Sequence, residues 1–250
     1  MKTTLSAQQQ VQEDEYLFPY HYLSLYSELH RDILHAHYLS ELKLLRELLG
    51  LDAASRLIDI GCGDGRFAYE LGESAAEYLG VDYSARAIAL ARAFNPSRRF
   101  ECGDLTGCVS TGKFSHGIAI QVLEHIPIES LASAVRNIAD AIEPGGKFVA
   151  SVPSTNLPLA RKHYQDFTVQ SLQKALSPAF ELVSAHGHIM AGSQWRRFCR
   201  MQKIASILWP MHKSVRPSAW YIRRVVRYFQ SIRVSDPAHC HTLVGVFRRL

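Results

Sequence analysis

Short apolar segments alternate with amphipathic ones along the middle of the chain. Patterns typical of buried strands recur in residues 56–60, 78–81, 99–102, 114–120 and 147–152. Between them, apolar positions at helical spacing predict helices over residues 64–71, 85–94 and 128–142. Strands that alternate with such helices form βαβ units, so we expect a parallel sheet with helices on its faces.

Less regular segments flank this region. Residues 1–15 are polar and expected to be frayed, and helical periodicity then continues to a stop at Gly50. The sequence Pro144-Gly145-Gly146 predicts a turn before the strand at 147–152. Further on, we expect a helix at 168–175 and strands at 180–185 and 242–247. We therefore predict an N-terminal helical cap at residues 1–50 and an α/β domain at residues 51–250.

Charge is distributed unevenly along the chain. The formal net charge is +5, but residues 195–233 contain ten Lys and Arg, no Asp or Glu, and all three tryptophans. This predicts a basic helical insertion at about residues 189–238, between the last two strands. Four roles are open for it: a lid, a lid that binds an acidic or amphiphilic acceptor, a peripheral membrane contact, or a nucleic-acid contact, which we rank last.

Composition excludes several classes of protein. The 47% hydrophobic and 20% charged residues are typical of a globular chain. Five scattered cysteines without a Cys-x-x-Cys pair fit neither a disulfide framework nor a cysteine-rich zinc site. Since no apolar stretch is long enough for a membrane span or a signal peptide, we expect a soluble, cytoplasmic protein.

The sharpest chemical signal is a glycine loop at residues 59–65, with the sequence Asp-Ile-Gly-Cys-Gly-Asp-Gly, directly after the first strand. Glycines there allow a tight turn and a close approach to a ligand. A dinucleotide site would require glycine in place of Arg66, and Asp64 would repel a pyrophosphate. A nicotinamide-dependent dehydrogenase is therefore disfavoured. A cationic donor such as S-adenosylmethionine suits Asp59 and Asp64 better.

Two further acidic residues follow the next two strands. Asp82 is placed to accept both hydroxyls of a ribose, and Asp104 to accept from an adenine amino group. Because the carboxyl ends of parallel strands meet at one edge of a sheet, we expect these side chains to lie near the glycine loop.

Five short motifs follow the predicted strands in order. They are Asp59 to Gly65, Val81-Asp82-Tyr83-Ser84, Cys102-Gly103-Asp104-Leu105, Gln121-Val122-Leu123-Glu124-His125-Ile126 and Glu143-Pro144-Gly145-Gly146-Lys147. In this order, residues 56–152 resemble the class I S-adenosylmethionine-dependent methyltransferases. The resemblance implies a Rossmann-like, doubly wound sheet of seven strands, mostly parallel with an antiparallel last strand.

The resemblance also implies which residues bind the cofactor, S-adenosylmethionine. Asp82 would hold the ribose, Tyr83 would flank the adenine, and Asp104 with Leu105 would recognise its edge. The complete set that we expect at the cofactor is Asp59, Gly61, Cys62, Gly63, Gly65, Asp82, Tyr83, Asp104, Leu105 and Gln121.

Candidate catalytic residues follow the fourth and fifth strands. Glu124 and His125 either fix their loop or contact the substrate or a metal. His163, in a stretch similar to a lysine-histidine-aromatic motif of small-molecule methyltransferases, is either the general base or a structural residue at a helix entry. For the acceptor we name Tyr20, Tyr22 and Tyr164.

Metal binding is not expected. Ubiquinone-pathway O-methyltransferases and small-RNA 3′-end methyltransferases resemble the stretch at 121–125 but have a metal-binding Glu-x-x-Glu-His, and Gln121 here occupies the first glutamate's place. Two histidine pairs could meet if the last strands pair antiparallel, but the insertion between them argues against a metal site. These pairs are His186 with His188 and His239 with His241.

The expected function is methyl transfer to an oxygen or nitrogen atom of a small molecule, such as a glycosylated or lipid-linked intermediate. Two alternatives remain: an RNA methyltransferase that uses Glu124 and His125, and a cofactor-binding protein without activity. The acceptor would be bound by the cap and the insertion, the two segments with the weakest patterns, so the sequence does not specify it.

Overall fold

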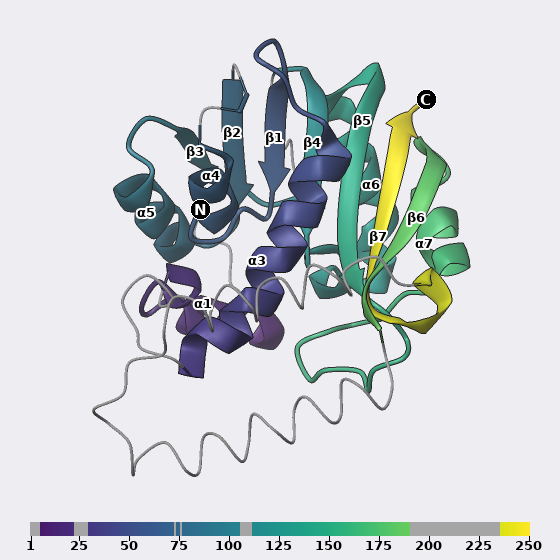
Figure 1. Cartoon of the computed structure of the whole chain (residues 1–250), viewed down its shortest axis with the longest axis horizontal. Helices are drawn as coiled ribbons and strands as arrows, with labels where there is room; N and C mark the ends of the chain where they lie inside the picture. The colour runs from purple at the N-terminus through teal and green to yellow at the C-terminus, as the bar shows by residue number, and fades with distance from the viewer. Residues whose placement is uncertain (1–5, 23–29, 73, 76, 106–111, 191–235) are drawn as a thin grey trace.

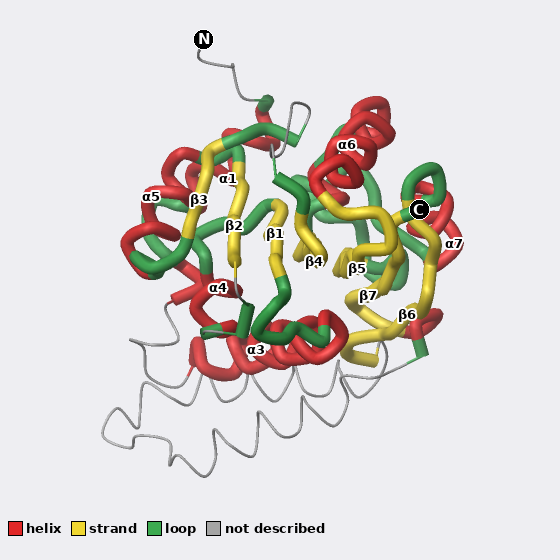
Figure 2. The backbone as a smooth tube through the Cα atoms, turned by 90° about the horizontal axis from the view of Figure 1, so that it is seen from above, coloured by secondary structure: helices red, strands yellow, loops and turns green. Residues whose placement is uncertain are grey.

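The computed structural model describes residues 6–22, 30–72, 74–75, 77–105, 112–190 and 236–250. Its centre is a seven-stranded sheet with the order β3-β2-β1-β4-β5-β7-β6 (Figures 1 and 2). β7 is antiparallel to both of its neighbours, and the other pairs are parallel. The strands are β1 (Arg56–Ile60), β2 (Glu77–Asp82), β3 (Arg99–Cys102), β4 (Phe114–Ile120), β5 (Ile142–Pro153), β6 (Phe180–Met190) and β7 (Cys240–Arg249). This confirms the expected doubly wound, Rossmann-like fold.

Helices cover both faces of the sheet (Figure 2). One face packs against α3 (His30–Leu49), α4 (Arg66–Leu71) and α5 (Ala85–Phe94) through one cluster of buried side chains. A second cluster joins the opposite face to α6 (Ile128–Ala141) and α7 (Val169–Leu176). The sheet is therefore the middle of three layers, and its strand ends remain available for a ligand site.

Local sequence determines where several helices begin and end. Ser84 caps α5 because its hydroxyl accepts from the Ala87 N–H at 3.0 Å. Thr168 and Ser171 form a capping box at the start of α7. At the end of α3, Gly50 has a φ of +62°, a left-handed conformation that glycine adopts at little cost. All three ends lie at or within two residues of the predicted ones.

Several boundaries differ from the prediction because pairing between strands decides them. β5 begins at Ile142 and includes the expected turn, with Gly145 at a φ of +78° and a shift in register opposite Phe114 and His116. β6 and β7 extend beyond the predicted strands because each pairs with the other along most of its length. α4 begins at Arg66, not at Asp64, since the preceding glycines have positive φ.

The N-terminal residues differ most from expectation. Residues 7–15, predicted to be frayed, form helix α1 (Ala7–Glu15), whose first turn is closed by a capping box between Ser6 and Gln9. Figure 1 shows α1 beyond the end of the sheet toward which β1 points. The predicted division at residue 50 stays a prediction, and residues 191–235 of the predicted insertion lie outside the described residues. None of the described helices has the length and apolarity to cross a bilayer.

Candidate functional site

A cavity of about 430 Å³ lies where the parallel strands end. The loops after β1, β2, β3, β4 and β5 form its floor, and residues of α1, α3 and the 3₁₀ turn Tyr20–Tyr22 close it from the other side. This volume is within the range of small-molecule sites. Segments far apart in the sequence therefore contribute to one site.

The glycine loop approaches its neighbours closely. Gly61 donates its N–H to the Val81 carbonyl at 2.7 Å, which turns the chain back over the end of β2. Gly63 has a φ of +55°, and a Cβ atom there would lie 2.6 Å from the hydroxyl of Tyr16. Gly61 likewise leaves no space for a Cβ atom beside Val122. Glycine is thus required at both positions, by backbone conformation and by space.

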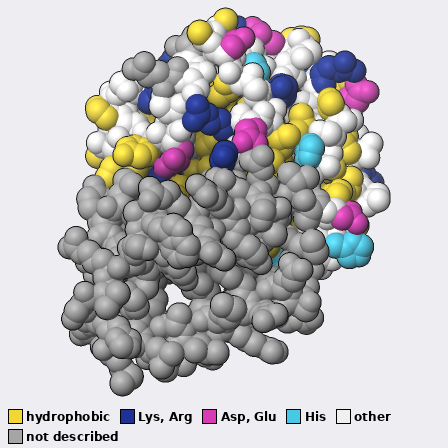
Figure 3. Space-filling model, in the orientation of Figure 1, with side chains coloured by type: hydrophobic (Ala, Val, Ile, Leu, Met, Phe, Trp, Pro, Cys, Tyr) yellow, Lys and Arg dark blue, Asp and Glu magenta, His cyan; other side chains and the backbone are white. Residues whose placement is uncertain are grey.

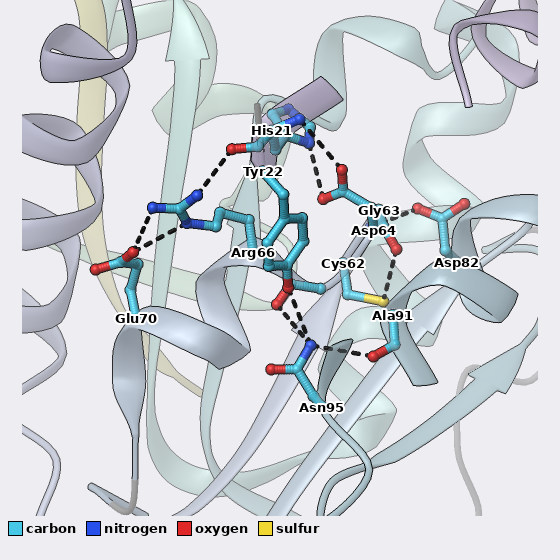
Figure 4. Close-up of polar contacts among 11 residues, drawn as sticks. His21, Tyr22, Cys62, Gly63, Asp64, Arg66, Glu70, Asp82, Ala91 and Asn95 are labelled. Atoms are coloured by element: carbon cyan, nitrogen blue, oxygen red, sulfur yellow. Dashed lines mark hydrogen bonds and ion pairs between the residues drawn. The ribbon is translucent and has the colours of Figure 1, made fainter. Parts of the chain in front are cut away.

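The N-terminal cap is attached directly to this loop (Figure 4). The buried carboxylate of Asp64 accepts the backbone N–H of His21 at 3.3 Å and contacts its ring Nδ1 at 2.9 Å. Arg66 donates to the His21 carbonyl at 2.9 Å and pairs with Glu70. Asp64, expected to face the cationic donor, therefore holds the cap in place and lies outside the cavity lining.

Asp59 and Asp82 are buried carboxylates beneath the cavity. Asp59 accepts from the Tyr78 hydroxyl at 2.6 Å, and its other oxygen has no hydrogen-bond partner. Asp82 accepts from the N–H groups of Gly63 at 3.0 Å and Ser84 at 2.8 Å. Burial raises the pKa of Asp59 to about 7 and that of Asp82 to about 6. A positively charged ligand would offset the cost of burying these charges.

The buried carboxylates of Asp59 and Asp82 fit S-adenosylmethionine, which is positively charged. The partnerless oxygen of Asp59 suits a cationic, hydrogen-bond-donating group, and the backbone amides hold Asp82 beside the cavity, where ribose hydroxyls can reach its free lone pairs. The cavity lining includes nine of the ten expected cofactor residues, namely Asp59, Gly61, Cys62, Gly63, Asp82, Tyr83, Asp104, Leu105 and Gln121.

The tenth expected residue, Gly65, has a different position. It caps the start of α4 in a left-handed conformation, and a Cβ atom there would lie 2.8 Å from Asn95 and 3.0 Å from Ala91. Gly65 therefore allows α4 and α5 to pack closely and does not line the cavity. The expectation that Gly65 takes part in cofactor binding stays a prediction.

Glu124, His125 and His163 meet at the other end of the cavity. Glu124 is fully buried, and neither carboxylate oxygen has a hydrogen-bond partner. Its Oε1 lies 4.0 Å from Nε2 of His125, whose Nδ1 is 3.1 Å from the Lys162 carbonyl. The rings of His125 and His163 meet edge to face at 4.9 Å, and Nδ1 of His163 contacts Asp166 at 3.2 Å.

Burial shifts the pKa values of two of these groups in opposite directions. It raises the pKa of Glu124 to about 8 and lowers that of His125 to about 4, because each loses the solvation of its charged form. His163 has a defined orientation, since a carboxylate only accepts and Nδ1 must therefore donate to Asp166. This leaves the Nε2 lone pair of His163 available to accept a proton.

The same three residues are a possible metal-ligand group. Glu124, His125 and His163 each have one possible ligand atom, and these three atoms lie within 4.8 Å of one another. Among the residues that the structure describes, no other group of three or more has this spacing. The sequence left metal contact open for Glu124 and His125 but did not bring His163 into the group. The histidines at the end of the sheet are arranged differently: His188 is buried beside Ser40 and His37, whereas His239 is exposed and pairs with Asp236.

The three tyrosines expected at the acceptor have different positions. Tyr20 lines the cavity. Tyr22 is buried outside it, stacked on Phe94 at 3.9 Å between ring centroids. The side chain of Tyr164 is not part of the lining either, but its backbone N–H donates to the Glu124 carbonyl at 2.8 Å.

Sequence reasoning assigned the acceptor to the N-terminal cap, but it missed helix α1 and the residues of α1 and α3 that line the cavity. α1 brings Gln8, Gln9 and Gln12 to the cavity, and α3 brings His37, Tyr38 and Glu41. Glu41 is 3% exposed and accepts from the Gln121 amide at 3.3 Å. A signal was present, because positions 37, 38 and 41 are polar residues on a helix whose periodicity predicts burial.

The sequence is similar to those of known methyltransferases. A family model described as a methyltransferase domain matches residues 30–207. A ubiquinone biosynthesis O-methyltransferase from Aromatoleum aromaticum is 29% identical over 133 residues, which are 47% of this chain and 56% of that protein. A protein of the same name from Alkalilimnicola ehrlichii is 29% identical over 121 residues, 46% of this chain and 48% of that protein. The chain thus spans about half the length of these curated relatives.

Solved structures share the fold at lower identity. An N-methyltransferase from Bradyrhizobium japonicum, in complex with S-adenosylhomocysteine, has a TM-score of 0.61 and 17% identity and covers 98% of this chain and 99% of its own. Magnesium protoporphyrin IX methyltransferase from Synechocystis, with bound S-adenosylmethionine, has a TM-score of 0.62 and 14% identity and covers all of both chains. At such identity these structures support the fold alone, whereas the family model covers more than half of the sequence. The chain therefore belongs to the methyltransferase domain family.

Proposed function

We propose that the chain transfers a methyl group from S-adenosylmethionine to an oxygen or nitrogen atom of a small molecule. The observation that carries this proposal is a single cavity that joins the cofactor residues to the group of Glu124, His125 and His163. When bound, the donor supplies a methyl group on a positively charged sulfur, so the protein mainly has to align donor and acceptor. Such alignment can lower a barrier by roughly 7–11 kcal/mol.

His163 is the proposed general base. It lines the cavity, and its contact with Asp166 fixes the ring and leaves Nε2 to accept a proton from the acceptor. A base in this position contributes typically about 10²- to 10⁴-fold in rate. The proposed roles of Glu124 and His125 are contacts with the acceptor, and Tyr20 is proposed to border it from the cap.

A small-molecule acceptor is favoured over RNA. Lys162 is the one Lys or Arg among the described residues that line the cavity, and it pairs with Glu15 at 3.0 Å. On the described part of the face in Figure 3, basic and acidic side chains are interspersed, without the basic stripe typical of nucleic-acid sites. The glycosylated or lipid-linked acceptor was predicted from the insertion, whose residues 191–235 are not described, and it stays a prediction.

Methyl transfer can be tested with a labelled donor. Purified protein is incubated with methyl-labelled S-adenosylmethionine and a cell lysate, which is then separated into small-molecule, lipid and RNA fractions. We expect label in the small-molecule or lipid fraction. Label confined to RNA would support the RNA alternative. Binding of S-adenosylhomocysteine without transfer to any fraction would support a cofactor-binding protein without activity.

A further inference from the structure

Two buried carboxylates from different layers of the fold lie at the acceptor end of the cavity. Glu41 belongs to α3 and is 3% exposed, and Glu124 follows β4 and is fully buried. Both line the cavity. Glu41 accepts from the Gln121 amide at 3.3 Å, whereas both oxygens of Glu124 lack a hydrogen-bond partner. Unpaired buried carboxylates are costly, which indicates that a ligand completes this part of the site.

No Lys or Arg of the described cavity lining forms an ion pair with Glu41 or Glu124. Among the described lining residues, the one Lys or Arg side chain is Lys162, which already pairs with Glu15. A ligand that carries positive charge and several N–H donors would stabilise the ionised form of both carboxyl groups and donate to their oxygen atoms.

We propose that Glu41 and Glu124 bind the amino group of the acceptor, so that the chain methylates nitrogen in a small amine. This inference rests on the proposed function and narrows its acceptor class. The bound ammonium group first gives one proton to Nε2 of His163. The freed nitrogen lone pair then forms the N–C bond while the bond from methyl to sulfur breaks, and the electron pair of that bond remains on sulfur.

A divalent metal ion explains the two buried carboxylates, Glu41 and Glu124, less completely than an amine does. It could be held by Glu124, His125 and His163, but Glu41 does not belong to that group of closely spaced ligand atoms. A bound metal would therefore leave the second buried carboxylate, Glu41, with hydrogen bonds but without a cationic partner. An ammonium group has three N–H donors and can donate to both carboxylates at once. Two aromatic residues that line the same cavity, Tyr20 and Tyr38, would border the organic part of such an acceptor.

The binding test compares two probes that differ only in the amine. The 250-residue chain, saturated with S-adenosylhomocysteine, is titrated calorimetrically with 2-phenylethylamine and with 2-phenylethanol, each with and without EDTA. We expect the amine to bind about tenfold or more tightly than the alcohol, as for a hydrogen bond to a charged partner. Glu41→Gln and Glu124→Gln should each remove this preference. Glu47→Gln, an exposed glutamate on the same helix, should retain it.

Four results of this titration would overturn the proposal. They are no binding of the amine, equal binding of both probes, a preference that survives in Glu41→Gln and Glu124→Gln, and a preference that EDTA removes. The last of these would indicate a metal site. The labelled product of the lysate assay provides a second measurement, because an N-methylated amine is retained on a cation exchanger and a neutral O-methyl ether or ester is not.

Failure of the proposed function gives a different result from failure of the inference. Label in an ether or ester contradicts amine binding while it supports methyl transfer. An amine preference that depends on both glutamates, without any transfer of label, supports the amine site and contradicts methyl transfer.

Discussion

The contact between the glycine loop and α1 can be tested by adding a single methyl group. In Gly63→Ala, the new Cβ atom would lie 2.6 Å from the hydroxyl oxygen of Tyr16, and the backbone would keep a φ of +55°. A left-handed conformation costs an L-residue about 1–2 kcal/mol. Overpacking adds typically about 1–3 kcal/mol. We therefore expect Gly63→Ala to lower the free energy of unfolding by about 2–5 kcal/mol.

The two contributions can be separated with a second substitution. Tyr16→Phe removes the oxygen atom and leaves the ring carbons, the nearest of which would lie 3.5 Å from the new Cβ, an ordinary contact distance. In the Tyr16→Phe background, Gly63→Ala should cost only the backbone strain of about 1–2 kcal/mol. The coupling free energy between the two sites is then about 1–3 kcal/mol.

Urea unfolding of the ligand-free protein, followed by circular dichroism, measures these values. Gly145→Ala is the control for backbone strain, because Gly145 has a φ of +78° and no neighbouring atom lies within 4 Å of a Cβ there. It should cost about 1–2 kcal/mol in either background. An equal loss for Gly63→Ala with and without the Tyr16 hydroxyl would refute the contact, and with it the position of α1 over the glycine loop.

Three further substitutions test the site. Asp82→Asn should weaken S-adenosylhomocysteine binding about ten- to a hundredfold. The single amide oxygen cannot accept from the two backbone N–H groups and from the ribose hydroxyls as well. Unchanged affinity in calorimetry would contradict this prediction. His163→Ala should leave that affinity intact and lower turnover about tenfold or more, and normal turnover would exclude His163 as the base. Burial raises the pKa of Glu124 from its usual 4.5 to about 8, so the folded state retains a proton that the unfolded chain releases. The contribution of this proton to the free energy of unfolding is complete below pH 4.5 and is lost as the pH rises through 8. Between pH 6.5 and 8, the free energy of unfolding of the ligand-free protein should therefore fall by up to about 1.4 kcal/mol per pH unit because of Glu124. Glu124→Gln should flatten that slope in urea titrations, and equal slopes would contradict the assignment.

The sheet could be predicted because its signals are local. The short apolar segments 56–60 and 99–102 and the helical segment 85–94 have the same bounds in the structure as in the prediction. The ends of β6 and β7 depend instead on pairing partners such as His188 and Thr242, which lie 54 positions apart in the numbering. No local pattern specifies such a register.

The cofactor end of the site was predicted better than the acceptor end for the same reason. The cofactor residues directly follow strands, where the topology of a parallel sheet brings them together. Glu41 enters the cavity only because α3 packs across the sheet, and Gln9 reaches it because its carbonyl accepts from the Tyr83 hydroxyl at 3.3 Å. Tyr22, by contrast, was expected at the acceptor but packs on Phe94 outside the cavity.

Calorimetric titration of the wild-type protein with S-adenosylhomocysteine and, separately, with NAD tests the central claim most directly. We expect saturable binding of S-adenosylhomocysteine, whose ammonium group suits the unpaired oxygen of Asp59. We expect no binding of NAD, because Asp64 in the glycine loop would repel its pyrophosphate. Binding of NAD together with no heat from S-adenosylhomocysteine would contradict the assignment of this cavity to the methyl donor.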